Sequence, residues 1–190
     1  MKITDRKSEI ISVSAKLFKE KGYSAVTMRD IAQAMDIKAA SLYNHIKSKQ
    51  EILVLILIEI AEEFTLVMNE IVISEETTIH KIEKVIQLHI NITLRNPDAL
   101  ACLNNDWMHL TDDKLSYFIK MREDYEENFR AIIKAGIASN EIKNLNSEII
   151  IFSILSTLRT LYLWYGKRKC FTEASLKNNL AEVLLDGVVN

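Results

Sequence analysis

Residues that interrupt a helix are scarce in this chain, whose 190 residues include one proline and four glycines. A many-stranded sandwich or barrel needs far more turn-forming residues than this. Apolar side chains instead recur at three- and four-residue spacing along almost the whole chain, which is the period of an amphipathic helix. Because 48% of the residues are hydrophobic, such helices can bury a sizeable core. We therefore predict an all-α fold of about nine helices.

Capping residues mark where several of the predicted helices begin and end. Gly22 follows a first helix of about residues 4–21, at the position that a C-cap glycine takes. Thr27 can cap a short second helix, with Asp30 three residues later, and Ser48 can cap a long one with Glu51 as its partner. The other predicted helices span about residues 38–46, 48–73, 76–95, 112–138, 147–165 and 172–188, and one more begins after Asn96-Pro97-Asp98.

Charge is divided unevenly along the chain. The net charge is −2, but residues 1–53 carry ten Lys and Arg against six Asp and Glu, whereas the remainder carries fourteen against twenty. A basic N-terminal part on an acidic body favours a polyanionic partner for the N-terminal part.

Membrane, secreted and enzymatic classes are disfavoured. The longest apolar run, Ile52–Ile58, has seven residues, against roughly 20 needed to cross a bilayer, and the N-terminus lacks a signal-peptide segment. Cys102 and Cys170 lack metal-ligand spacing, which favours two reduced core thiols. The sequence also lacks paired Glu-x-x-His motifs, a glycine-rich phosphate loop and a Gly-x-Ser-x-Gly motif. We expect a cytoplasmic protein that is not an enzyme, has no contact with a membrane and needs no cofactor or metal.

Residues 27–46 have the pattern of a helix-turn-helix, two short helices joined by a tight turn. Ile31 and Met35 form an inner face that can pack on Phe18 of the first helix. The second short helix must enter a major groove about 12 Å wide, so its leading residues should be small. Ala39, Ala40 and Ser41 meet this demand. Tyr43 can place its ring against thymine methyl groups or its hydroxyl on phosphate, and Lys47 and Lys49 flank the start of the next helix, where phosphate is favoured.

These residues also resemble a known family. The segment TMRDIAQAMDIKAASLYNHIKSKQEIL, residues 27–53, and the upstream AKLFKEKGYSAVTMRDIA closely resemble the DNA-binding domain of TetR-family repressors. The resemblance covers about residues 4–64. Its elements, Phe–(3)–Gly–Tyr, Thr-x-Arg-Asp-Ile-Ala and Leu-Tyr-x-His-x-x-(Ser/Lys)-Lys, stand in the family's order and spacing. Many members have glycine in the turn where this chain has Asp36, and we expect the turn to survive because aspartate tolerates left-handed backbone geometry.

The resemblance implies a set of DNA contacts. It implies contacts to base edges from Ala39, Ala40, Ser41 and Tyr43. It implies contacts to phosphate from Thr27, Arg29, Asn44, His45 and Lys49, and Lys38 and Lys47 flank the same surface.

The helix predicted at about 147–165 points to a partner subunit. Twelve of the seventeen residues from Ile149 to Tyr165 are apolar, on every side of the helix, so one face needs cover from a second chain. The resemblance agrees, since TetR-family proteins dimerise through their last two long helices. The expected interface combines a stripe of small residues with an apolar face of the last helix: Ser153, Ser156, Thr157, Thr160, Leu176, Leu180, Leu184 and Val188.

Aromatic and isolated polar residues in the middle of the body are the candidate ligand site. Arg159 is the most suggestive, as a charge in an apolar helix. RxDYEENFRAIIKAGI, LRTLYLWY and FTEASL also resemble, more loosely, the subgroup that responds to fatty acyl-CoA ligands. Arg122 and Arg159 favour an apolar effector with an anionic head, such as an acyl-CoA or a fatty acid. The candidate residues are Trp107, His109, Arg122, Tyr125, Phe129, Phe152, Arg159 and Trp164.

We thus expect a homodimeric regulator with a DNA-binding domain at residues 1–50 and a ligand-binding and dimerisation domain at residues 51–190. Its expected function is that of a repressor released from a double-stranded DNA operator by a small molecule. Two alternatives stay open: an adaptor that binds only protein, and, within the family, a regulator of multidrug efflux that takes a neutral or cationic aromatic drug.

Overall fold

The computed structural model describes residues 6–167 and 171–189. Within these residues it contains nine α-helices, two short 3₁₀ helices and no strand beyond one isolated antiparallel bridge, Ile142–Val189. This confirms the predicted all-α fold. The chain forms two compact units, Met1–Ala61 with Asp98–Ile119 and Glu62–Pro97 with Lys120–Asn190. Two helices, α4 (Lys49–Ile73) and α7 (Asp112–Ala138), begin in the first unit and end in the second.

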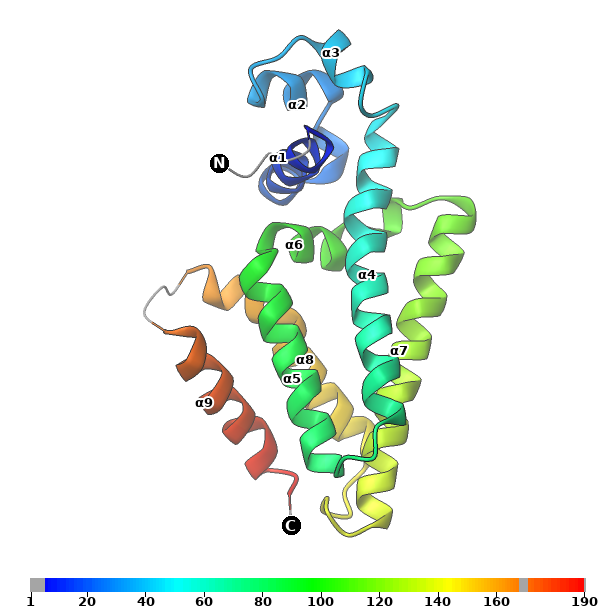
Figure 1. Cartoon of the computed structure of the whole chain (residues 1–190), viewed down its shortest axis with the longest axis vertical. Helices are drawn as coiled ribbons and strands as arrows, with labels where there is room; N and C mark the ends of the chain where they lie inside the picture. The colour runs from blue at the N-terminus through cyan, green and yellow to red at the C-terminus, as the bar shows by residue number, and fades with distance from the viewer. Residues whose placement is uncertain (1–5, 168–170, 190) are drawn as a thin grey trace. The chain divides into compact units, whose positions relative to one another are not determined.

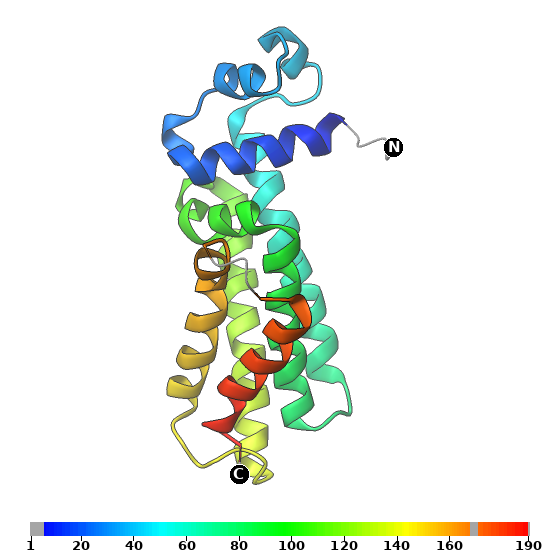
Figure 2. The ribbon, with the colours of Figure 1, turned by 90° about the vertical axis from the view of Figure 1, so that its left-hand side faces the viewer.

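The first unit holds the short N-terminal helices. Its elements are α1 (Arg6–Lys21), the 3₁₀ helix η1 (Tyr23–Ala25), α2 (Met28–Ala34), α3 (Ala39–Tyr43), the start of α4, α6 (Pro97–Asn105), the 3₁₀ helix η2 (Trp107–His109) and the start of α7. Figure 2 shows α1 as the longer helix of this group, followed by the short α2 and α3.

Buried residues of α1 and α2 form the core of the first unit, and a glycine ends α1. Phe18 and Ile31 are 1% and 0% exposed, and α1 packs on α2 as predicted. α1 ends at Gly22, whose φ of 80° suits glycine and whose N–H donates to the Phe18 carbonyl at 2.7 Å. This confirms the predicted C-cap. The 3₁₀ helix that follows was not predicted, because three residues are too few to show a period.

The second unit is a bundle of longer helices. It contains the end of α4, α5 (Thr78–Arg95), most of α7, α8 (Ser147–Tyr165) and α9 (Glu173–Asp186). α5 packs against both α8 and α9, and Figure 1 shows the three side by side. Thr77, Asn146 and Thr172 cap α5, α8 and α9, each accepting a hydrogen bond from a main-chain N–H.

One of the chain's two cysteines, Cys102, is a buried free thiol. Cys102 lies in α6 with its side chain buried, and its thiol donates to the Ala15 carbonyl at 3.5 Å. Burial raises the pKa of this thiol to about 12, so it stays protonated and unreactive. Cys102 is therefore the predicted reduced core cysteine, whereas Cys170 lies outside the described residues.

Candidate functional site

Local hydrogen bonds fix the start of α2 and the turn after it. The Thr27 hydroxyl accepts from the Asp30 N–H at 3.2 Å, and the Asp30 carboxylate accepts from the Thr27 N–H at 2.7 Å. These reciprocal bonds confirm the predicted N-cap. The Thr27 hydroxyl also donates to the Asp30 carboxylate at 2.6 Å, and this bond, with the one from the Thr27 N–H, holds the pKa of Asp30 below its usual value. Asp36 adopts a left-handed φ of 53°, as expected for a residue that replaces glycine in this turn.

α3 is anchored on one side and exposed on the other. Leu42 and Ile46 are 0% and 1% exposed, whereas Tyr43 is 53% exposed. A short helix held from behind in this way presents its outer side chains to a major groove. Ala39 and Lys49 are half-buried, and the other residues expected to contact DNA are exposed: Thr27, Arg29, Lys38, Ala40, Ser41, Tyr43, Asn44, His45 and Lys47.

Lys49 faces the interior of the first unit. Its ammonium donates to the carbonyl oxygens of Tyr23 and Val26, both at 2.8 Å, and lies 4.2 Å from the centroid of the Tyr23 ring. The Tyr23 hydroxyl donates to the Gln50 amide oxygen at 2.7 Å. The first turn of α4 is thereby tied to η1, the segment that leads into the helix-turn-helix.

Two residues predicted to bind ligand lie in this first unit. Trp107 stacks on Phe118 with ring centroids 6.0 Å apart. The His109 carbonyl accepts from the Gln50 amide at 3.0 Å, and its ring lies 5.0 Å from the Tyr23 ring. The structure thus gives His109 a place in the packing around η1.

Two of the predicted ligand residues belong to the core of the second unit. Tyr125 and Phe129 on α7 are 6% and 0% exposed. The Tyr125 hydroxyl lies 2.9 Å from Nε2 of His89, and the His89 ring lies 4.6 Å from the Phe64 ring. Burial lowers the pKa of His89 to about 3, with the charge of Arg159 as a smaller cause. This is a neutral, hydrogen-bonded pair surrounded by aromatic rings.

The two predicted arginines complete this group. Arg159 on α8 donates to the Glu126 carboxylate on α7 at 2.6 Å, and Arg122 is an exposed residue one helical turn before Glu126. Sequence reasoning missed Glu126, His89 and Phe64. The sequence places His89 on the apolar face of its helix, but it does not reveal that Tyr125 on α7 is the partner of His89.

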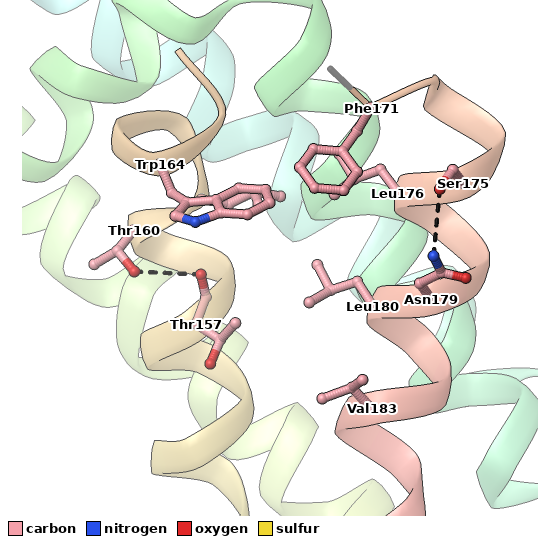
Figure 3. A pocket seen from close by; sticks show the side chains of 10 residues that line it. Thr157, Thr160, Trp164, Phe171, Ser175, Leu176, Asn179, Leu180 and Val183 are labelled. Carbon is pink, nitrogen blue, oxygen red and sulfur yellow. Dashed lines mark hydrogen bonds between the residues drawn. The ribbon is translucent and has the colours of Figure 1, made fainter. Parts of the chain in front are cut away.

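The remaining two candidates lie on the outside of α8. Phe152 is 70% exposed and Trp164 is 42% exposed. Trp164 stacks on Phe171 with centroids 5.2 Å apart, at one end of a groove of about 400 Å³ between α8 and α9. In Figure 3, Leu180 and Val183 of α9 point into this groove from the side opposite Trp164 and Thr160.

The outer face of α8 is apolar and exposed. Ile149 is 64% exposed, and Val183 on the neighbouring α9 is 71% exposed. Among the described helices, α8 alone is long and apolar enough to span a membrane, a composition that a helix covered by another protein chain shares. Of the predicted interface residues, the exposed ones are Ser153 and Thr160, the half-buried ones are Ser156, Thr157, Leu180 and Leu184, and those buried within the chain are Leu176 and Val188.

Comparison with known proteins gives the same assignment for both parts of the chain. The family model described as "Bacterial regulatory proteins, tetR family" matches residues 10–56. A second, "Tetracyclin repressor-like, C-terminal domain", matches residues 75–188, which is more than half of the chain.

Individual relatives match along almost the full chain. The HTH-type transcriptional repressor KstR2 of Rhodococcus jostii (strain RHA1) is 24% identical over 187 residues, 97% of this chain and 92% of the relative. The fatty acid metabolism regulator protein of Bacillus subtilis (strain 168) is 25% identical over 187 residues, 96% of this chain and 95% of the relative. The solved structure of the ketosteroid transcriptional regulator KstR2 of Mycobacterium tuberculosis has the same fold, with a TM-score of 0.91 at 19% identity over 100% of this chain and 97% of that one. The chain belongs to the TetR family of bacterial regulatory proteins.

Proposed function

We propose that this protein is a transcriptional repressor that binds operator DNA as a homodimer and leaves it when a small molecule binds the second unit. The observation that carries the proposal is α3, which exposes small and polar residues on one side and is fixed by the buried Leu42 and Ile46 on the other. This role makes it a cytoplasmic protein without enzymatic activity.

The DNA contacts follow from exposure and chemistry. Ala39, Ala40, Ser41 and Tyr43 would lie against base edges, where small side chains permit close approach and a tyrosine ring can meet thymine methyl groups. The phosphate contacts would come from the polar residues around them: Thr27, Arg29, Lys38, Asn44, His45 and Lys47.

A binding titration tests this assignment. Duplex fragments that carry the intergenic DNA beside the protein's own gene would be titrated, with fluorescence anisotropy as the signal and random duplex as the competitor. We expect Tyr43→Ala to weaken specific binding by about 1–3 kcal/mol, the usual value of a good base contact. Because Tyr43 is 53% exposed, its removal should leave the thermal stability unchanged. Equal affinity of the wild type for intergenic and random duplex would contradict the proposal.

The effector that we propose has an apolar tail and an anionic head, as in an acyl-CoA or a fatty acid. The support is a pair of arginines in the second unit, together with a relative named as a fatty acid metabolism regulator. Arg159 is paired with Glu126 and is close enough to the buried His89 and Tyr125, and to Arg122, to affect their pKa values. Burial of hydrocarbon contributes roughly 0.8 kcal/mol per CH₂. A hundredfold loss of operator affinity needs a coupling of about 2.7 kcal/mol, which a long tail can supply.

A thermal-shift panel tests the effector class. Acyl-CoAs, free fatty acids and cationic dyes would be compared, followed by DNA release with each compound that stabilises the protein. We expect acyl-CoAs or fatty acids to stabilise and release, and Arg159→Ala to lose that response. Stabilisation and release by cationic dyes alone would instead support an efflux-type regulator.

A further inference from the structure

Thr93 on α5 has a buried hydroxyl group that is left without a hydrogen bond. The residue is 1% exposed, and its Oγ1 has no hydrogen-bond partner among the residues that the structure describes. A threonine inside a helix normally donates to the carbonyl four residues before it. Thr157 and Thr160 on α8 do so, at 3.0 and 2.8 Å, but Thr93 does not. A buried unsatisfied hydroxyl is costly, and valine would fill the same space without that cost.

Thr93 shares a face of α5 with a second buried polar residue, His89. Thr93 follows His89 by four residues, so both lie on the same inward face of α5. His89 is 5% exposed and exchanges a hydrogen bond with the Tyr125 hydroxyl at 2.9 Å. The Phe64 ring packs on His89, with centroids 4.6 Å apart, and is 5.9 Å from the Tyr125 ring. Polar groups thus line one short stretch of an otherwise apolar core.

The electrostatics of this stretch limit what it can bind. Burial keeps the His89 ring neutral and raises the pKa of the Tyr125 hydroxyl above its usual value, so the pair carries no charge near neutral pH. The charge that acts on both residues is Arg159, which is paired with Glu126 at 2.6 Å. A neutral oxygen can exchange hydrogen bonds with these groups, whereas a carboxylate placed there would lose its hydration without gaining an opposite charge.

We propose that Thr93, together with the His89–Tyr125 pair, binds a neutral oxygen of the effector, such as an ester, thioester or ketone carbonyl or a hydroxyl. The inference rests on the proposed function. It adds a second recognised group of the effector to the anionic head that the arginines would bind. The anionic head belongs with Arg159, and the neutral oxygen lies further along the ligand, against α5. Such a site favours ligands that carry this oxygen, because only they give the buried Thr93 hydroxyl a hydrogen-bond partner.

The test measures binding directly and without DNA, so its outcome is separate from that of the repressor proposal. The probes are methyl decanoate, 1-decanol and decanoate, titrated against the full-length wild type, Thr93→Val and Thr93→Ser. Thr93→Val should weaken binding of the two neutral probes about five- to tenfold, the effect of one hydrogen bond, whereas Thr93→Ser should retain it. Decanoate carries the anionic head that we assign to Arg159 but no neutral oxygen, so Thr93→Val should leave its binding unchanged. Thr93→Val should be at least as stable as the wild type.

A spectroscopic readout and a matched control complete the test. The carbonyl stretch of ¹³C-labelled methyl decanoate should move to lower frequency when bound to the wild type and return toward its free position in Thr93→Val. Ser14 on α1 carries the other buried hydroxyl without a partner among the described residues. Ser14→Ala should therefore gain stability with no change in probe binding. Equal binding of the neutral probes to the wild type and Thr93→Val, an unshifted carbonyl stretch, or failure of the wild type to bind either neutral probe would overturn the proposal.

Discussion

Two neighbouring lysines, Lys47 and Lys49, differ in what surrounds their ammonium groups. Lys47 is exposed beside α3, whereas the Lys49 ammonium donates to two main-chain carbonyls and lies over the Tyr23 ring. An exposed lysine near a phosphate contributes through counterion release, and an internal one contributes to folding. Both lysines were expected to reach phosphate. Their surroundings instead favour DNA binding for Lys47 and stabilisation of the fold for Lys49.

We predict that alanine substitution separates these two roles. Lys47→Ala should weaken binding to all duplexes alike and lower the slope of log affinity against log salt by about one, with unchanged thermal stability. Lys49→Ala should lower the free energy of unfolding by about 1–3 kcal/mol, because two part-buried carbonyls lose their donor. Salt-dependent anisotropy and urea denaturation measure the two quantities. A drop in salt slope for Lys49→Ala with unchanged stability would assign Lys49 to the DNA instead.

His89 should make the stability of the protein depend on pH in a defined window. Its pKa is about 3 in the folded protein and about 6.5 in an unfolded chain, so only the unfolded state takes up a proton between these values. Stability is therefore complete above pH 6.5 and falls as the pH drops below it, by up to about 1.4 kcal/mol per unit. His89→Gln, which cannot titrate, should flatten this dependence between about pH 6.5 and 5. Equal slopes in urea titrations of wild type and variant would refute the assignment.

For single residues, the sequence pattern predicts the buried face of a helix but not the residue that lies opposite it. Periodicity placed Tyr125 and Arg159 on helices that face the core, and the structure joins them to His89 and Glu126. A repeat of three or four residues tells which face of a helix is buried, but not which residue of another helix lies opposite. Phe152 and Trp164 show the same limit, since an aromatic side chain on an apolar helix can face either the core or a partner.

At the scale of elements, local chemistry was sufficient to predict most boundaries. Thr27, Ser48 and Gly22 cap helices as their types and neighbours indicated, because caps are made within a few residues of the chain. The Glu51 carboxylate departs slightly from the predicted capping box and accepts from the Lys47 N–H at 2.7 Å. The two 3₁₀ helices were missed, since their shape depends on contacts such as those of Tyr23 with Lys49.

Gly136 lies where α7 packs closely against Thr78, the first residue of α5. It lies within the last turns of α7, where a Cβ atom would stand 2.4 Å from Cγ2 of Thr78 and 2.8 Å from Cδ1 of Ile142. We predict that Gly136→Ala destabilises the protein by about 1–3 kcal/mol, despite the higher helix propensity of alanine. Thermal and urea unfolding would measure the loss.

A second substitution checks that the loss comes from this contact. Thr78→Ser removes Cγ2 but keeps the hydroxyl that bonds the Glu141 carboxylate at 3.2 Å. In the Gly136→Ala background it should recover part of the lost stability, giving a favourable coupling between the two sites. Strictly additive effects would mean that Thr78 is not the source of the strain.

At the scale of the whole molecule, the outer face of α8 and α9 should decide the oligomeric state. Phe152, Ile149 and Val183 are 70%, 64% and 71% exposed in the single chain, which is unusual for large apolar residues gathered on adjacent helices. The small Ser153 and Thr160 on the same helix donate their hydroxyl protons to carbonyls of their own helix, so they can meet an apolar surface. We propose that a second copy of the chain covers this face.

We predict that a charge at the centre of this face separates the subunits. Phe152→Glu should convert the dimer to a folded monomer, because the exposed site can solvate the charge in the monomer but not at an interface. Leu66 on α4, 63% exposed, offers a matched control: Leu66→Glu should change neither mass nor DNA binding. Sedimentation equilibrium at micromolar protein gives the mass of each variant.

The Phe152→Glu monomer should also lose most of its operator affinity, since a single helix-turn-helix reads one half-site where a dimer reads two. A wild type that sediments as a monomer would remove the basis of this prediction, and an unchanged dimer in Phe152→Glu would place the interface elsewhere.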